Sequence, residues 1–178
     1  MTFSTDEDHS SGDAVARLLE YWRSRGVPIL PGSHEHEIAE FERRHRVVLP
    51  PDLREFVRQC GGIGGDTGEA DARDFRGLIE FWPLHSYESL ATRYRHEEQL
   101  SLGPWDSRQF FIFADFSLHS HHYAIRLSPD SGAPTPVLLY AGPRYAHIVG
   151  NSFSDFVWTY LTDPVGAVRP QTLSQMEG

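Results

Sequence analysis

The densest group of side chains able to do chemistry is a run of histidines, His119, His121 and His122, which follows Asp115. Zinc accepts imidazole and carboxylate ligands, but a site needs three or four of them around one ion. In a continuous strand, His119 and His121 would share one face and His122 would point away. Asp115 or His147 could extend this partial set. We expect an exposed hairpin here and no metal ion.

The glycine-rich run from Gly61 to Gly68 raises the question of a phosphate-binding loop. Such a loop lies between a strand and the N-terminus of a helix, and a lysine reaches the phosphates. This run instead follows a predicted helix, and the chain contains no lysine. Four acidic residues in and after the run would also repel phosphate: Asp66, Glu69, Asp71 and Asp74. We therefore expect an acidic loop and no nucleotide.

Nucleophilic catalysis has little support in the sequence. Cys60 is the only cysteine, which excludes an internal disulfide, and it is predicted on the buried face of a helix near its C-terminus. The partial negative charge of that helix end disfavours a thiolate. The chain has no Gly-x-Ser-x-Gly motif of the kind that presents a nucleophilic serine. We expect a protein that is not an enzyme and that needs no cofactor.

The charge balance constrains the class of partner. Sixteen basic residues, all of them arginine, face twenty-five acidic ones, which gives a formal net charge of −9. This balance opposes nucleic-acid binding, which draws much of its affinity from Lys and Arg contacts to phosphate. It would accelerate association with a basic protein through electrostatic steering. Acidity that serves only solubility is the alternative, and the charge alone leaves it open.

The length and composition favour one domain in the cytoplasm. A chain of 178 residues is long enough to bury about 70% of its unfolded surface. No apolar run approaches the ~20 residues that a membrane helix needs, so we expect no membrane contact. The acidic N-terminus is unlike a secretory signal. The expected organisation is a disordered tail at 1–11, one domain at 12–163 and a mobile tail at 164–178.

Apolar residues at helical spacing predict most of the helices in the first third of the chain. The clearest begins at Pro51, where the missing N–H suits the first turn. It carries one buried stripe at i, i+3, i+4 and i+7, formed by Leu53, Phe56, Val57 and Cys60. Gly61 is placed to end this helix in the left-handed conformation. Four other helices are predicted. One occupies 13–25, a second begins at Ser33, a third begins at Ser86, and the last runs from Ser152 to Asp163.

The pattern changes to strands later in the chain. Runs rich in β-branched and aromatic residues, separated by turn signals, lie at 78–82, 109–114, 121–127, 137–140 and 145–149. Short connections among the later runs favour antiparallel pairing, since parallel neighbours need long crossovers. The sequence therefore predicts an α+β fold, with helices packed on one face of a mainly antiparallel sheet.

Four short signatures follow one another in a fixed order. They are Leu49–Phe56 running into Gly61 and Gly62, then Phe81–Leu84, then Phe110–Asp115, and then Ser152–Phe156. In this order the chain resembles the SUKH superfamily, the Smi/Knr-type domain, over roughly residues 33–162. The resemblance implies the α+β fold described above and carries over no catalytic residue.

The resemblance also implies a function. Many bacterial members are immunity proteins of polymorphic toxin systems, so we expect this protein to bind and neutralise a cognate toxin, which could be a nuclease with a basic surface. A regulatory or scaffold module, like the fungal Smi/Knr relatives, is the alternative, and a metal-dependent hydrolase is a distant third. The sequence does not distinguish a monomer from a dimer.

Two places are candidates for the partner-binding surface. Loops held by rigid elements are where binding residues concentrate, and the acidic stretch after the third helix fits this description. The second candidate is a hairpin tip whose apolar groups could anchor a partner. The residues concerned are Asp66, Glu69, Asp71 and Asp74 in the first, and Phe116, Leu118 and His119 in the second.

Overall fold

The computed structural model describes residues 11–63, 79–96, 102, 104–116, 119–142 and 145–167. Its α-helices are α1 (Ser11–Ser24), α2 (Glu35–His45), α3 (Pro51–Gln59), α4 (Leu90–Arg93) and α5 (Phe153–Thr162). Its strands are β1 (Ile79–Phe81), β2 (Glu88–Ser89), β3 (Phe110–Phe116), β4 (His121–Arg126), β5 (Val137–Tyr140) and β6 (Ala146–Gly150). Two 3₁₀ turns, η2 (Leu84–Ser86) and η3 (Ser107–Gln109), connect these elements.

The strands form one antiparallel sheet in the order β1-β3-β4-β5-β6, and β2 pairs with a further part of β3. Consecutive strands from β3 to β6 are neighbours, as short hairpin connections require. The antiparallel sheet predicted from the turn signals is therefore confirmed.

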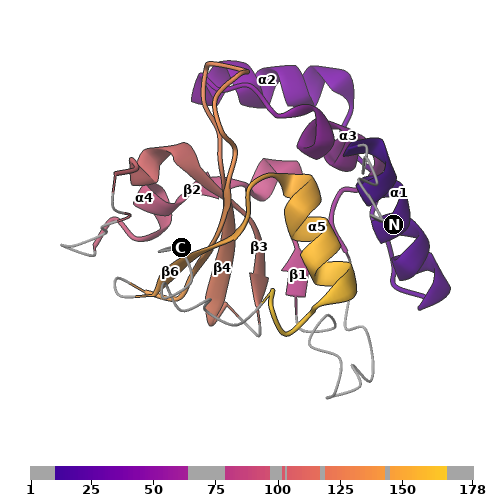
Figure 1. Cartoon of the computed structure of the whole chain (residues 1–178). Helices are drawn as coiled ribbons and strands as arrows, with labels where there is room; N and C mark the ends of the chain where they lie inside the picture. Colours follow the sequence, from indigo (N-terminus) through magenta and orange to yellow (C-terminus); the bar gives the residue numbers. More distant parts are fainter. Residues whose placement is uncertain are drawn as a thin grey trace, which may run out of the picture.

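The long helices α1, α3 and α5 lie together on one side of the sheet (Figure 1). Trp22 of α1 lies at the centre of the core between them. Its ring packs edge-on against Phe56 of α3 and Phe81 of β1. Its indole N–H donates to the Tyr160 hydroxyl of α5 at 3.1 Å. These contacts join three helices to the sheet and confirm the predicted α+β fold.

The opposite face of the sheet carries a second, smaller apolar cluster that includes Phe110, Ile112 and Leu138. Leu90 of α4 belongs to this cluster, and α4 lies across the sheet from α5 (Figure 1). The continuous apolar run at the start of β3 reflects burial on both faces, whereas a strand with one wet face alternates.

Two predicted helix starts were wrong. The helix predicted at Ser33 begins at Glu35, because the Glu37 carboxylate accepts a hydrogen bond from the backbone N–H of His34. The helix predicted at Ser86 is replaced by η2, β2 and the single turn α4. Glu88 and Ser89 pair with β3 instead of joining a helix, and the Ser89 hydroxyl then accepts from the Thr92 N–H as the cap of α4.

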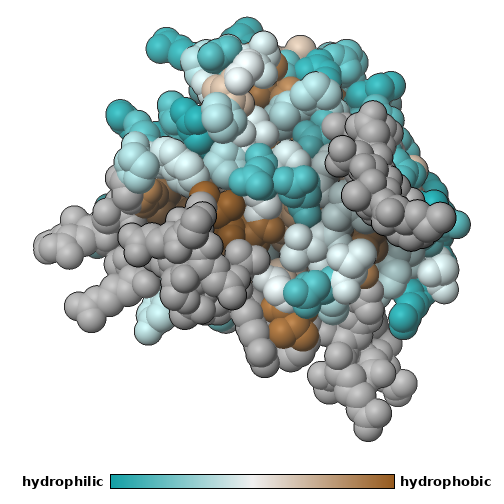
Figure 2. Space-filling model, in the orientation of Figure 1, coloured by the Kyte–Doolittle hydropathy of each residue, from teal (hydrophilic) through white to brown (hydrophobic). Residues whose placement is uncertain are grey.

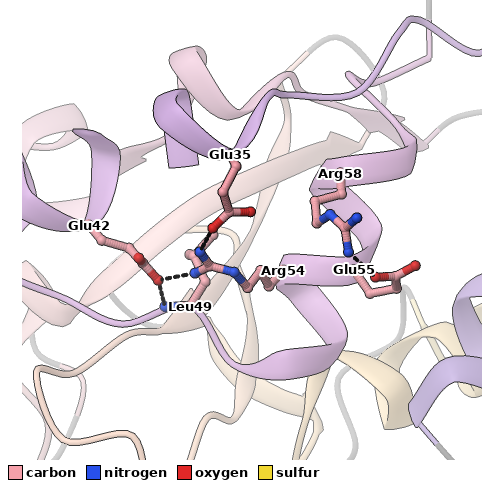
Figure 3. A network of polar contacts seen from close by, with 6 residues as sticks. All are labelled: Glu35, Glu42, Leu49, Arg54, Glu55 and Arg58. Atoms are coloured by element: carbon pink, nitrogen blue, oxygen red, sulfur yellow. Dashed lines mark hydrogen bonds and ion pairs between the residues drawn. The ribbon is translucent and has the colours of Figure 1, made fainter. Parts of the chain in front are cut away.

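The corner between α2 and α3 is held by a network of charged groups (Figure 3). The Arg54 guanidinium of α3 bonds to the carboxylates of Glu35 and Glu42 of α2. Glu42 Oε1 also accepts from the backbone N–H of Leu49 at 2.8 Å. One carboxylate oxygen thus fixes both the connecting segment and the following helix.

The glycine pair after α3 also differs from the prediction. Gly62 adopts positive φ, at 101°, rather than Gly61. Gly61 instead lies so close to the Pro31 carbonyl that a β-carbon would collide with it. Its N–H donates to the Leu30 carbonyl at 2.9 Å. The pair therefore joins the end of α3 to the segment that precedes α2.

The described chain stays packed through Ala167, which is buried and whose carbonyl accepts from the Tyr123 hydroxyl at 2.9 Å. The remainder of the tails expected at the two ends, 1–10 and 168–178, lies outside the described residues. In the part of the chain that the structure describes, no helix has the length and apolar character to cross a membrane.

Candidate functional site

A β-bulge in β3 determines which side chains meet on the second face of the sheet. The pairing of β3 with β4 shifts between Ile112 and Ala114, so that one extra residue enters β3. A bulge of this kind changes the face to which the following side chains point. Beyond it, Asp115 lies directly opposite His122, on the face that carries Ile112. Without the bulge, Asp115 would point into the larger core.

A row of side chains crosses the sheet at this level. Glu80 of β1 is the register partner of Asp115 in β3, and Asp115 is also the partner of His122 in β4. On its other side, His122 pairs with Tyr140 of β5. Directly opposed residues of an antiparallel sheet have neighbouring side chains on the same face. Two carboxylates and an imidazole therefore lie side by side.

Asp115 is a buried carboxylate, only 1% exposed. Its Oδ2 accepts from the Trp82 indole N–H at 2.6 Å, and its Oδ1 accepts from the His119 backbone N–H at 3.1 Å. The His119 imidazole lies 3.1 Å from Oδ2 through Nδ1. Among the described residues, this imidazole is the one basic side chain within ion-pair distance of Asp115.

His122 is also buried, at 2% exposure. Its Nδ1 lies 2.6 Å from the Tyr94 hydroxyl, while its Nε2 has no hydrogen-bond partner within the described part of the chain. Burial, helped by the positive charge of Arg93, lowers the pKa of His122 to about 4. The imidazole is therefore neutral at physiological pH, and one of its nitrogens is buried without a partner.

His119 covers this group from the solvent side. It has a positive φ of 64° in the turn between β3 and β4, and its side chain is 55% exposed. Its ring is nearly parallel to that of His122, at 13°, with 6.1 Å between centroids. His119 lies in the turn before β4, outside the strand, so it does not share a strand face with His121. The His121 ring instead packs edge-on against Phe116.

We refer to this site as the β3–β4 corner, formed by Glu80, Trp82, Asp115, His119 and His122. Within the described residues, no group of three His, Cys, Asp or Glu side chains could hold a metal ion. The other candidate ligand, His147 in β6, pairs with Leu139 of the larger core and so faces the opposite side of the sheet.

Two of the sequence-derived binding residues lie in the described part of the chain. Phe116 is half-buried and packs against the larger core, whereas His119 is exposed. The other five residues lie outside the described residues. They are Asp66, Glu69, Asp71 and Asp74 of the acidic stretch and Leu118 of the hairpin tip.

Sequence reasoning missed the contributions of Glu80 and Trp82 to the β3–β4 corner. Glu80 alternates with Ile79 and Phe81 of the larger core, a local signal that it faces the other side of the sheet. Nothing local, however, indicates that it lies beside Asp115.

Cys60 occupies the buried position expected from the helical stripe. Its thiol donates to the Gly62 carbonyl at 3.4 Å, and burial raises the pKa of the thiol to about 11. At neutral pH this sulfur is a protonated core group and a poor nucleophile.

The hydrophobic surface on the face shown in Figure 2 lies mainly in front of the strands and at the lower edge, while hydrophilic residues predominate around α2 at the top. Among the described residues, the most exposed large apolar side chains are Leu30, Val48, Tyr145 and Ile148. They are dispersed over several elements, and two of them lie in or beside the edge strand β6.

Comparison with known families gives one result for this chain. The model of the SMI1/KNR4 family (SUKH-1) matches residues 32–158, well over half of the sequence. The matched region begins just before α2, ends within α5 and contains the whole β3–β4 corner. A search of curated proteins found no match.

Proposed function

Because this chain belongs to the SMI1/KNR4 family (SUKH-1), we propose that it is an immunity protein, which binds a cognate protein toxin and neutralises it. The observation that carries the proposal is the family match across the folded core. The net charge of −9 supports a basic partner. Toxins blocked by proteins of this kind include nucleases, whose substrate-binding surfaces are basic.

The proposed mechanism is occlusion through protein–protein contact. Carboxylates on the immunity protein bind the arginines and lysines that the toxin would use for its polyanionic substrate. The long-range field of an acidic protein also accelerates encounter with a basic one, most strongly at low salt. Inhibition then requires no chemical step by this chain, and the buried, protonated thiol of Cys60 agrees with a binding role.

The contact surface belongs to the same proposal. We assign it first to the acidic residues Asp66, Glu69, Asp71 and Asp74, and second to Phe116, Leu118 and His119 at the β3–β4 hairpin. The exposed ring of His119 favours the second group, because it is available to a partner.

A regulatory or scaffold role is the second candidate. The matched family is named after SMI1 and KNR4, and the resemblance to the fungal Smi/Knr proteins implies a regulatory role. Such a module also works by protein binding, so the fold serves both roles equally well. The two differ in the partner: a toxin encoded beside the gene supports immunity, and a partner encoded elsewhere supports the scaffold.

Co-expression with the product of the neighbouring gene, if that gene encodes a toxin, tests the proposal. The expected result is rescue of growth and co-purification of the two chains. Leu53→Asp is the matched negative control, since it puts a charge on a residue with no exposure. Growth arrest that wild-type protein does not relieve, with both chains produced, would overturn the immunity function.

A further inference from the structure

We propose that the β3–β4 corner is a docking site for one arginine side chain of the partner, whose guanidinium binds Asp115 and Glu80 in place of the His119 ring. This inference rests on the proposed function and adds the chemistry of the partner group.

The first argument is an excess of negative charge. Glu80 and Asp115 are directly opposed in neighbouring strands, an arrangement in which like charges repel. Within the described chain, no arginine lies within ion-pair distance of either carboxylate. An imidazole carries positive charge only when protonated. A cation from outside the chain would therefore relieve the repulsion at this position.

The second argument is access. Asp115 itself is buried, but the His119 ring that covers its Oδ2 is more than half exposed and belongs to a turn. When this ring rotates away, the bonds from the Trp82 indole and from the His119 backbone N–H still hold the carboxylate. The receptor group is thus fixed before the ligand arrives, which reduces the ordering cost of binding.

The third argument selects guanidinium among cations. A planar guanidinium has several N–H donors in a fork and can bond to two acceptor groups at once. The Trp82 ring lies 6.0 Å from that of His119 in an edge-on arrangement at 71°, so a planar group that replaces the imidazole would have an aromatic neighbour.

The state of His122 agrees with a cationic ligand. The pKa of His122 is lowered to about 4 by burial, so the neutral ring does not repel a cation. Its unpartnered Nε2 is a further polar group at the same site. A bare metal ion fits less well, because no three-ligand group exists among the described residues.

The direct test uses N-acetyl-arginine methylamide as a probe and follows the Trp82 indole N–H by nuclear magnetic resonance. This proton reports on the site because it bonds to Asp115, and Trp82→Phe assigns its signal. We expect a saturable shift with a dissociation constant on the order of 10 mM, as the few atoms of one side chain allow. N-acetyl-lysine methylamide should bind more weakly.

Four variants separate the contributions. Asp115→Asn should abolish the response, and Glu80→Gln, at an exposed position, should weaken binding about fivefold or more. His119→Ala should strengthen binding, because it removes the competing ring. Asp130→Asn is the matched control: it removes an exposed carboxylate in the turn after β4, remote from the β3–β4 corner, and keeps the oxygen that accepts from Gly132.

The inference is overturned if the Trp82 signal does not respond to the probe, or if the affinity for the probe is unchanged in both Glu80→Gln and His119→Ala. The two exposed-site variants decide the matter even if Asp115→Asn fails to fold. Saturation of the signal by calcium or zinc, with no response to the arginine probe, would also overturn it. These measurements need no toxin, so they stand apart from the rescue assay. Full rescue and unchanged toxin affinity in Glu80→Gln would refute the arginine site and leave the immunity function intact.

Discussion

The carboxylate of Asp52 accepts two hydrogen bonds from Ser154, 102 positions further along the chain. Its Oδ2 receives the backbone N–H and the hydroxyl of Ser154, both at 2.9 Å, and its exposure is 5%. Asp52 lies in the first turn of α3 and Ser154 in the first turn of α5. One buried negative charge therefore meets the positive ends of two helices.

Replacement of Asp52 by alanine should destabilise the protein by about 2–3 kcal/mol, since two buried donors of Ser154 lose a charged acceptor. Asp52→Asn should cost less, because the amide oxygen can still accept. Urea unfolding measures both. Asp130→Asn, which keeps the oxygen that accepts from the Gly132 N–H in an exposed turn, should change stability by no more than about 0.5 kcal/mol. If Asp52→Ala were as stable as the wild type, the Asp52–Ser154 contact would not be what holds α3 and α5 together.

Replacement of Phe156 by alanine should cost about 3–5 kcal/mol. The ring has no exposure and packs against Phe113, Tyr123 and Phe153. Thermal and urea unfolding measure the loss. Tyr145→Ala is the control, since that ring is exposed. A small effect for Phe156→Ala would mean that the core around α5 collapses to fill the cavity.

Substitutions in the charged network between α2 and α3 should reduce stability by different amounts, with a larger loss for Glu42 than for Arg54. Arg54→Met should cost about 1 kcal/mol, because the guanidinium is partly exposed and is screened by salt. Glu42→Ala should cost more, since the Leu49 N–H also loses its acceptor. Arg58→Met removes a more exposed pair with Glu55 and should be nearly neutral (Figure 3). The opposite order, with Glu42→Ala the milder change, would contradict the role assigned to Glu42.

The stability of the protein should fall as the pH drops from about 6.5 to about 4. A histidine in the unfolded chain has a pKa of about 6.5, whereas the pKa of His122 in the folded protein is lowered to about 4 because burial disfavours the imidazolium. Between these values the unfolded chain binds a proton that the folded chain does not, so acid favours unfolding. The contribution reaches about 3 kcal/mol at the lower end.

Urea unfolding at several pH values measures this effect. In His122→Asn the part of the pH dependence due to His122 should disappear, whatever the effect on stability at neutral pH. His85→Asn, at an exposed position, should retain it. A direct titration of the His122 ring with a midpoint near 6.5 would contradict the expected shift.

Reversal of Asp71 and Asp74 to arginine should slow association with the toxin and weaken its salt dependence, if the acidic stretch meets a basic surface. Stopped-flow mixing at low and high salt measures the association rate. Thermal unfolding of the variant provides the control for folding. Unchanged association at low salt, with the toxin identified, would move the interface to the β3–β4 hairpin.

Features that depend on neighbours in sequence were predictable. The helical stripe of Leu53, Phe56 and Val57 is buried as its spacing requires. The Ser152 hydroxyl caps α5 by accepting from the Asp155 N–H at 3.0 Å. Short turns led to the antiparallel order of β3 to β6. In each case the controlling contacts span a few residues, so the pattern along the chain contains them.

The sequence by itself thus determined the helical stripes, the cap of α5 and the class of fold, because periodic burial and hairpin connections are local. Only the tertiary structure decided which chemical groups meet. The bulge between Ile112 and Ala114 turned Asp115 toward His122, and the pairing of β1 with β3 brought Glu80 beside it. Strand register depends on the packing of distant segments, and one inserted residue reverses the facing of all that follow.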